Sequence, residues 1–388
     1  MARVSLRLTG LLSALAIGAA ACGGGQAVDG GPSRGAERVG ASSTKAVELR
    51  AGLTYLAVED VDLVGLAADR AAEGPVLAGE LRALDDNAAE ISRVLSDSPT
   101  IQVLLRSVGA RRHATLLAHA AGRRAHDRAA TAASATALDE QLTSFAQLVH
   151  ASADSVGLAE LTAELRGASS GQLAAVDAAF VHAPEAPALL AAAAARASRT
   201  AALLAAGLAA HLGLGATTGP AAEVRAGLTA LLVEHVYGVA AVTGSGAGHA
   251  AALRELDAGS IALTRLLAGT HPEAQAPLLA TWREHIAFFQ RYAVAGPQHD
   301  RSAAAAARRG LDGDRRAFGA SVQQAVPALP AETVATELIG HVATLLTALD
   351  AVAAGDPDAP VALRAAAGPM PGVAAVLAGG ITEDRQLR

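Results

Sequence analysis

Apolar residues recur three and four positions apart along almost the whole chain after residue 44, which is the spacing of one face of a helix. Alternating β-branched runs, which are typical of strands, are absent from the sequence. Clusters of Gly, Pro or Asp interrupt the pattern at 73–75, 97–99, 183–187, 213–220, 244–248, 271–272, 296–297, 327–330 and 355–357. The sequence therefore predicts an all-α fold made of helices of ordinary length.

The second half of the sequence repeats the first half. The segment LRAGLT at 49–54 returns as VRAGLT at 224–229. The register then continues, because Asp85, Arg93, His113, Phe145 and Asp177 match Asp257, Arg265, His285, Phe318 and Asp350. The repeat predicts two tandem homologous helical bundles of about five to six helices each. We expect the first bundle at 45–212, a linker at 213–224 and the second bundle at 225–388.

The N-terminus reads as a secretion signal followed by a tether. Two arginines precede an apolar run that ends near residue 21, and this run is too short to span a membrane. The following segment, 22–44, is rich in Gly, Ser and Pro and has no hydrophobic period, so we expect a flexible tether. Residues 1–21 are therefore expected to form a signal peptide.

The residues around Cys22, AAAC followed by three glycines, resemble a bacterial lipobox. This resemblance implies cleavage before Cys22 and attachment of a lipid to its sulfur, which would anchor the protein to the extracytoplasmic face of the cell membrane. Ala19 stands where lipoboxes usually have Leu, which leaves ordinary signal-peptidase cleavage as the alternative. Because Cys22 is the sole cysteine, the chain cannot form an internal disulfide.

Composition and charge exclude several classes of function. The chain is 52% hydrophobic but only 2% aromatic, so its cores must be built mainly from Ala, Leu and Val. The net charge is -6 and no basic block occurs, which argues against nucleic-acid binding. The sequence also lacks a P-loop, a G-x-S-x-G nucleophile motif and an H-E-x-x-H zinc motif, so we do not expect a catalytic protein.

Three helices of the second half each place a histidine within their apolar stripe. Steps of three and four residues give Leu228-Leu232-His235-Val239, then Leu278-Trp282-His285-Phe289, then Val334-Leu338-His341-Leu345. If the three stripes face one interior, the three imidazoles converge, as ligands do in the cores of helical bundles. His235, His285 and His341 are therefore candidate metal ligands.

Three neutral imidazoles suit zinc, copper or haem-type iron, and we expect copper or zinc. Met370, in a Gly-Pro-Met-Pro segment, is a candidate soft fourth ligand. The alternative is that each histidine is an ordinary core residue with its own hydrogen bond to a carbonyl or carboxylate. The two interpretations differ in the heights of the histidines along their helices, which the sequence does not give.

The first half serves as an internal comparison. At the positions equivalent to the three histidines it has Asp60, His113 and Ala168. A full three-histidine site therefore cannot form there from equivalent residues. Both halves do keep a His-Asp-Arg tripeptide, at 126–128 and 299–301, whose Asp we expect to cap the first turn of the following helix.

The segments around the three histidines, VEHVY at 233–237, TWREHI at 281–286 and HV at 341–342, resemble a group of secreted bacterial helical-repeat proteins of uncharacterised function. The resemblance covers most of 225–383 and, more weakly, 50–212. It implies an extracytoplasmic bundle protein and assigns no activity.

These observations favour a membrane-anchored extracytoplasmic lipoprotein that acts as a non-catalytic binding module, with a transition-metal site in the second bundle. The alternative is a structural or interaction protein of the cell envelope that binds a peptide, a lipid or a partner helix between its bundles without metal. Expected partners are the membrane, through the lipid on Cys22, and an envelope protein or small ligand.

Overall fold

A computed structural model of the chain describes residues 40–387, apart from 75, 77, 244–247 and 297. The described residues are almost entirely helical and contain no strand, so the predicted all-α fold is confirmed. The elements of the first half are η1 (Ala41–Ser43), α2 (Lys45–Glu73), α3 (Ala78–Leu95), α4 (Pro99–Arg124), α5 (Arg128–Ser152), α6 (Leu158–Phe180) and α7 (Ala186–Leu212). Those of the second half are α8 (Pro220–Ala241), α9 (His249–Ala268), α10 (Pro272–Ala295), α11 (Arg301–Ala325), α12 (Ala331–Ala353), α13 (Ala359–Ala367) and α14 (Met370–Asp384).

The two His-Asp-Arg tripeptides adopt the same local structure. The side chain of Asp127 accepts a hydrogen bond from the backbone N–H of Ala130 at 3.0 Å, and Asp300 accepts one from Ala303 at 2.9 Å. These bonds satisfy an N–H group that the first turn of a helix leaves without a partner. The predicted capping role of both aspartates is confirmed.

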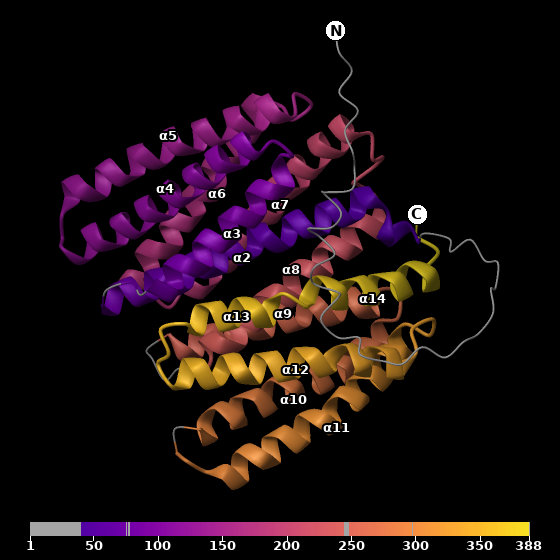
Figure 1. Cartoon of the computed structure of the whole chain (residues 1–388). Helices are drawn as coiled ribbons and strands as arrows, with labels where there is room; N and C mark the ends of the chain where they lie inside the picture. Colours follow the sequence, from indigo (N-terminus) through magenta and orange to yellow (C-terminus); the bar gives the residue numbers. More distant parts are fainter. Residues whose placement is uncertain (1–39, 75, 77, 244–247, 297, 388) are drawn as a thin grey trace.

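Helices α2 and α8 lie side by side at the centre of the molecule (Figure 1). The hairpin α4–α5 forms one outer edge, and the hairpin α10–α11 forms the opposite edge. Helix α8 buries side chains around its whole circumference, because α2, α9 and α14 pack against it. The candidate histidine of α8 therefore lies deep inside the protein.

The two halves share a hydrophobic core. One cluster of buried side chains belongs to the first half alone, whereas the larger cluster joins residues of α2 and α3, such as Val61 and Leu84, to residues of the second half. A buried charge pair also crosses the junction, since Arg364 of α13 donates to Glu59 of α2 at 2.9 Å. Glu59 is completely buried, and it also accepts hydrogen bonds from Tyr55 and Asn87.

Two expected boundaries shift in the structure. Helix α8 begins at Pro220, so 220–224 of the expected linker 213–224 belong to a helix, because proline fits the first helical position. The expected tether 22–44 includes η1, which packs against α8 and α14. The expected signal peptide 1–21 and Cys22 lie outside the described residues.

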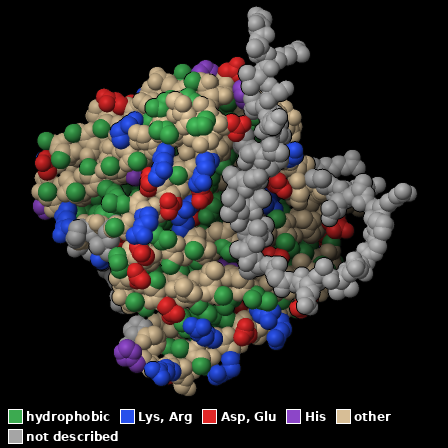
Figure 2. Space-filling model, in the orientation of Figure 1, with side chains coloured by type: hydrophobic (Ala, Val, Ile, Leu, Met, Phe, Trp, Pro, Cys, Tyr) green, Lys and Arg blue, Asp and Glu red, His purple; other side chains and the backbone are tan. Residues whose placement is uncertain are grey.

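The visible surface mixes charges of both signs, with basic and acidic side chains interspersed among hydrophobic ones (Figure 2). Among the described residues, three segments are long and apolar enough to cross a membrane by composition, namely Ala186–Leu212, Ala331–Ala353 and Ala359–Asp384. Between 39% and 44% of their most apolar windows is buried inside the protein.

Candidate metal centre

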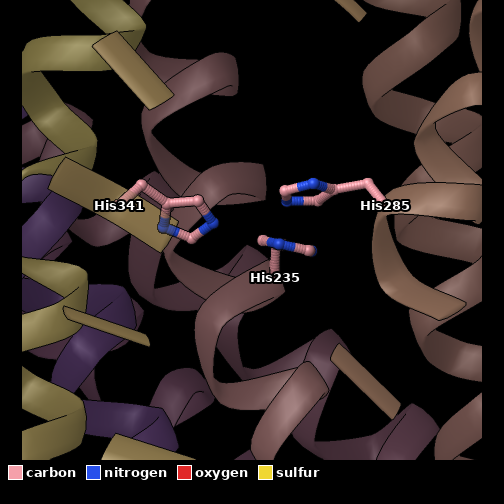
Figure 3. A group of neighbouring side chains, drawn as sticks. All are labelled: His235, His285 and His341. Atoms are coloured by element: carbon pink, nitrogen blue, oxygen red, sulfur yellow. The ribbon is translucent and has the colours of Figure 1, made fainter. Parts of the chain in front are cut away.

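The three predicted histidines meet inside the second half. His235 comes from α8, His285 from α10 and His341 from α12, and their rings point toward one another (Figure 3). One ligand nitrogen of each ring lies within 4.8 Å of those of the other two. The ring centroids are 5.5–5.8 Å apart. The predicted convergence of the three stripes is confirmed, and the heights along the three helices match.

Most nitrogens of these rings have no hydrogen-bond partner in the part of the chain that the structure describes. Both nitrogens of His235, both of His341 and Nε2 of His285 are buried and unpaired. The three residues are only 4%, 1% and 0% exposed. A buried polar atom without a partner costs roughly 1–3 kcal/mol, so protein interiors almost always pair such atoms. Each neutral ring has one lone pair, so the three converging nitrogens, one from each ring, call for a ligand that accepts their lone pairs.

Asp314 of α11 orients one of the three rings. Its Oδ2 lies 3.0 Å from Nδ1 of His285, and both side chains are almost completely buried. Since a carboxylate only accepts, Nδ1 carries the hydrogen and the lone pair of Nε2 faces the other two histidines. A carboxylate bound to the far nitrogen of a metal-ligating histidine is a common feature of metal sites.

The sequence analysis did not identify Asp314, although a signal for it exists. Asp314 falls on the apolar stripe of α11, between the buried Leu311 and Phe318. A lone acidic residue on such a stripe must find a buried partner when the helix folds. That requirement points to a histidine or an arginine across the core.

Aromatic side chains surround the three imidazoles. The ring of Trp282 lies 4.6 Å from that of His235 and 5.1 Å from that of His285. Phe289 packs edge-on against His285 at 4.9 Å, and Phe318 packs against Trp282 at 5.0 Å. These four aromatic contacts give the site apolar walls that keep its polar atoms away from bulk water.

The surroundings keep His235 and His341 neutral at pH 7. Burial, assisted by repulsion from His285, lowers the pKa of His341 to about 3. Burial and the other two histidines lower the pKa of His235 well below its ordinary value. A neutral imidazole is the form that binds a metal ion, so at pH 7 no proton has to leave these two rings first.

Met370, the predicted fourth ligand, is a buried residue at the start of α14. Helix α14 packs against α8 and α12, the helices that carry His235 and His341. Met370 belongs to the same hydrophobic core as the aromatic wall. The group of converging ligands consists of the three histidines, and coordination by Met370 stays a prediction.

A cavity of about 130 Å³ reaches the site from the junction between the halves. His235 and Trp282 are among its lining residues, and Asp62, Glu234 and Glu255 supply carboxyl groups to its walls. Desolvation raises the pKa of Glu234 to about 7. The cavity shares lining residues, among them Gly65 and Leu190, with a crevice of about 640 Å³ between the two halves.

The equivalent place in the first half has different chemistry. Asp60 stands in the position of His235 and lies 2.7 Å from Nε2 of His113, and it also pairs with Arg112. Burial alone would raise the pKa of Asp60, but Arg112 and His113 together hold it below its ordinary value. An ion pair fills the place of the metal ligands, as the replacement of two histidines by Asp60 and Ala168 in the sequence indicated.

Comparison of the chain with protein-family models, with curated proteins and with solved structures finds no match. The resemblance to secreted helical-repeat proteins stays a prediction.

Proposed function

We propose that this protein binds one transition-metal ion, zinc or copper, between His235, His285 and His341. The observation that carries this proposal is the convergence of three buried imidazoles, each of which has a nitrogen without a partner among the described residues. A metal ion accepts lone pairs from several directions at once, which no single hydrogen-bond donor does. The remaining coordination position is open to water, to Met370 or to a small ligand.

The geometry favours a single ion over haem. In a tetrahedral zinc site with Zn–N bonds of about 2.0 Å, ligand nitrogens are about 3.3 Å apart. The present separation of at most 4.8 Å closes to that value through modest rotations of the imidazole side chains. Haem iron takes protein ligands along one axis, from opposite faces of a wide macrocycle, and three rings converging on one point do not match that requirement.

The competing interpretation, a structural protein without metal, expects each histidine to have its own hydrogen bond. His285 has one, to Asp314, but His235 and His341 have none within the described chain. The carboxylate of Asp314 binds Nδ1 of His285, where it would orient a metal-ligating ring. It leaves Nε2 of that ring without a partner among the described residues. This pattern favours metal binding over a purely structural role.

We further propose that the protein holds this ion at the extracytoplasmic face of the membrane, anchored by a lipid on Cys22. The support is the sequence alone, namely the signal-like residues 1–21 and the lipobox-like residues around Cys22. The protein would then act as a non-catalytic binding module for metal at the cell surface. Radioactive palmitate should label the wild-type chain in cells and should not label the Cys22→Ala variant, which would still be made.

The metal proposal is tested by metal content. The purified full chain is loaded with zinc or copper, dialysed exhaustively and analysed by mass spectrometry. We expect about one retained ion per chain, lost in His285→Ala. The matched control is His211→Ala, which removes an exposed histidine at the end of α7 and should retain the ion. No retention by the wild-type chain, or equal retention by both variants, would contradict the proposal.

A further inference from the structure

A second cavity lies inside the first half, at the place equivalent to the metal centre. Its volume is about 120 Å³, and all six helices α2–α7 contribute to its walls. The walls are mostly apolar, with side chains such as Leu53, Val108 and Phe145. His113 and Asp60, the counterparts of His285 and His235, also line it.

Smaller side chains account for this cavity. In the register of the repeat, Ala110 of the first half stands where the second half has Trp282, and Ala168 stands where it has His341. Trp282 and His341 are completely buried in the second half, where they fill the interior. Replacing large buried side chains by alanine leaves space that the surrounding helices only partly close.

Three buried polar atoms of cavity-lining residues have no hydrogen-bond partner among the described residues. They are Nδ1 of His113, Oγ of Ser169 and Oε1 of Gln141. The other hydroxyl groups in the wall are satisfied, because Ser92 and Thr200 donate to backbone carbonyls of their own helices. Among the lining residues, the unpaired polar atoms therefore belong to His113, Ser169 and Gln141.

The chemistry of these atoms defines what they would bind. Asp60 accepts from Nε2 of His113 at 2.7 Å, which leaves Nδ1 of that ring for a ligand, and Oε1 of Gln141 is an acceptor. The hydroxyl of Ser169 can donate. A ligand hydroxyl fits this set, since it donates to one atom and accepts from another.

We propose that the first half binds a small apolar alcohol in this cavity, with its hydroxyl held by His113 and Ser169. An apolar cavity of about 150 Å³ in another protein holds one benzene molecule, so about 120 Å³ suits a single ring or a short hydrocarbon chain. This inference goes beyond metal binding and does not depend on it, since the two sites share no ligand residue.

Phenol and benzene are the probes, and their dissociation constants for the full chain are measured by calorimetry. We expect both to bind to the wild-type protein. Ala168→Leu places a side chain in the cavity and should abolish the binding of both. Ala163→Leu, an exposed substitution on the same helix α6, is the matched control and should bind both like the wild type.

A second variant tests the role of the hydroxyl. Ser169→Ala should weaken phenol binding about fivefold, which corresponds to one neutral hydrogen bond, and should leave benzene binding unchanged. This comparison holds even if Ala168→Leu impairs folding, because Ser169→Ala removes a single buried oxygen.

Three results would overturn the proposal. One is the absence of saturable phenol binding by the wild-type chain, which is expected if the cavity holds only water. Another is equal binding by folded Ala168→Leu. A third is an equal effect of Ser169→Ala on phenol and benzene, which would refute recognition of the hydroxyl.

Discussion

Asp314→Asn removes the charge that orients one metal ligand and leaves the shape of the core nearly unchanged. In the wild type, Oδ2 of Asp314 accepts from Nδ1 of His285 at 3.0 Å, and the two side chains are 3% and 1% exposed. The carboxylate fixes which nitrogen of His285 carries hydrogen and increases the basicity of the other. Loss of such a partner weakens metal binding about 10- to 100-fold, or roughly 1.4–2.7 kcal/mol.

The assay is a competition titration with a zinc chelator of known affinity, read at pH 7. The matched control is Asp312→Asn, the same change two residues earlier on α11, where the side chain is 72% exposed. The control should bind zinc like the wild type. If Asp314→Asn and Asp312→Asn bind zinc equally well, the carboxylate of Asp314 has no part in metal binding and this reasoning is refuted.

Three further predictions concern stability and metal uptake. In the folded metal-free protein the pKa of His341 is lowered from 6.5 to about 3, so between these two pH values the unfolded chain binds more protons than the folded one. The free energy of unfolding therefore falls as the pH drops below 6.5. The loss is about 1.4 kcal/mol per pH unit, measurable by urea unfolding, and His341→Leu should remove this contribution. Arg364→Met leaves the buried carboxylate of Glu59 without this cation and should lower the free energy of unfolding by roughly 3 kcal/mol in the same assay. Arg82→Met, at an exposed ion pair, should lower it by under about 1 kcal/mol. Gly259→Leu narrows the cavity that His235 and Trp282 line and should slow zinc uptake about tenfold, as measured by stopped-flow tryptophan fluorescence. Gly372→Leu, on the exposed side of α14, should leave the rate of uptake unchanged. Equal rates for the two variants would contradict entry through that cavity.

The positions of the three histidines on their helix faces could be predicted from sequence, because steps of three and four residues fix which side chains share a face. The match of their heights could not be predicted. Height depends on the helix ends and crossing angles, and a difference of four residues would have moved one histidine about 6 Å along its axis. The structure supplies this missing quantity, since the three ligand nitrogens lie within 4.8 Å of one another.

Other features of the site depend on contacts between distant segments. Asp314 could have been suspected as a charge on an apolar stripe, but its partner His285 lies on another helix. The pairing of Glu59 with Arg364 across the halves has no signature in either local sequence. The linker prediction extended past Pro220 because Gly and Pro mark the break between helices without showing on which side the next helix begins.

The ion pair of the first half lies at positions that the sequence register aligns with the metal ligands. Asp60 and His113 stand at positions that the sequence register aligns with two of the histidines, yet they hydrogen-bond to each other in place of forming a three-histidine set. The sequence indicated the loss of ligands there, whereas the pairing of the replacement with His113 and Arg112 becomes visible only in the structure. Metal is accordingly expected in the second half alone.

X-ray absorption at the zinc edge, on the zinc-loaded full chain, tests the central claim most directly. The account predicts nitrogen or oxygen ligands at about 2.0–2.1 Å, with the outer-shell scattering of three imidazole rings. In His341→Ala, if zinc is retained at all, one imidazole contribution should be missing. A spectrum without three imidazoles, or one unchanged by His341→Ala, would contradict a metal centre formed by His235, His285 and His341.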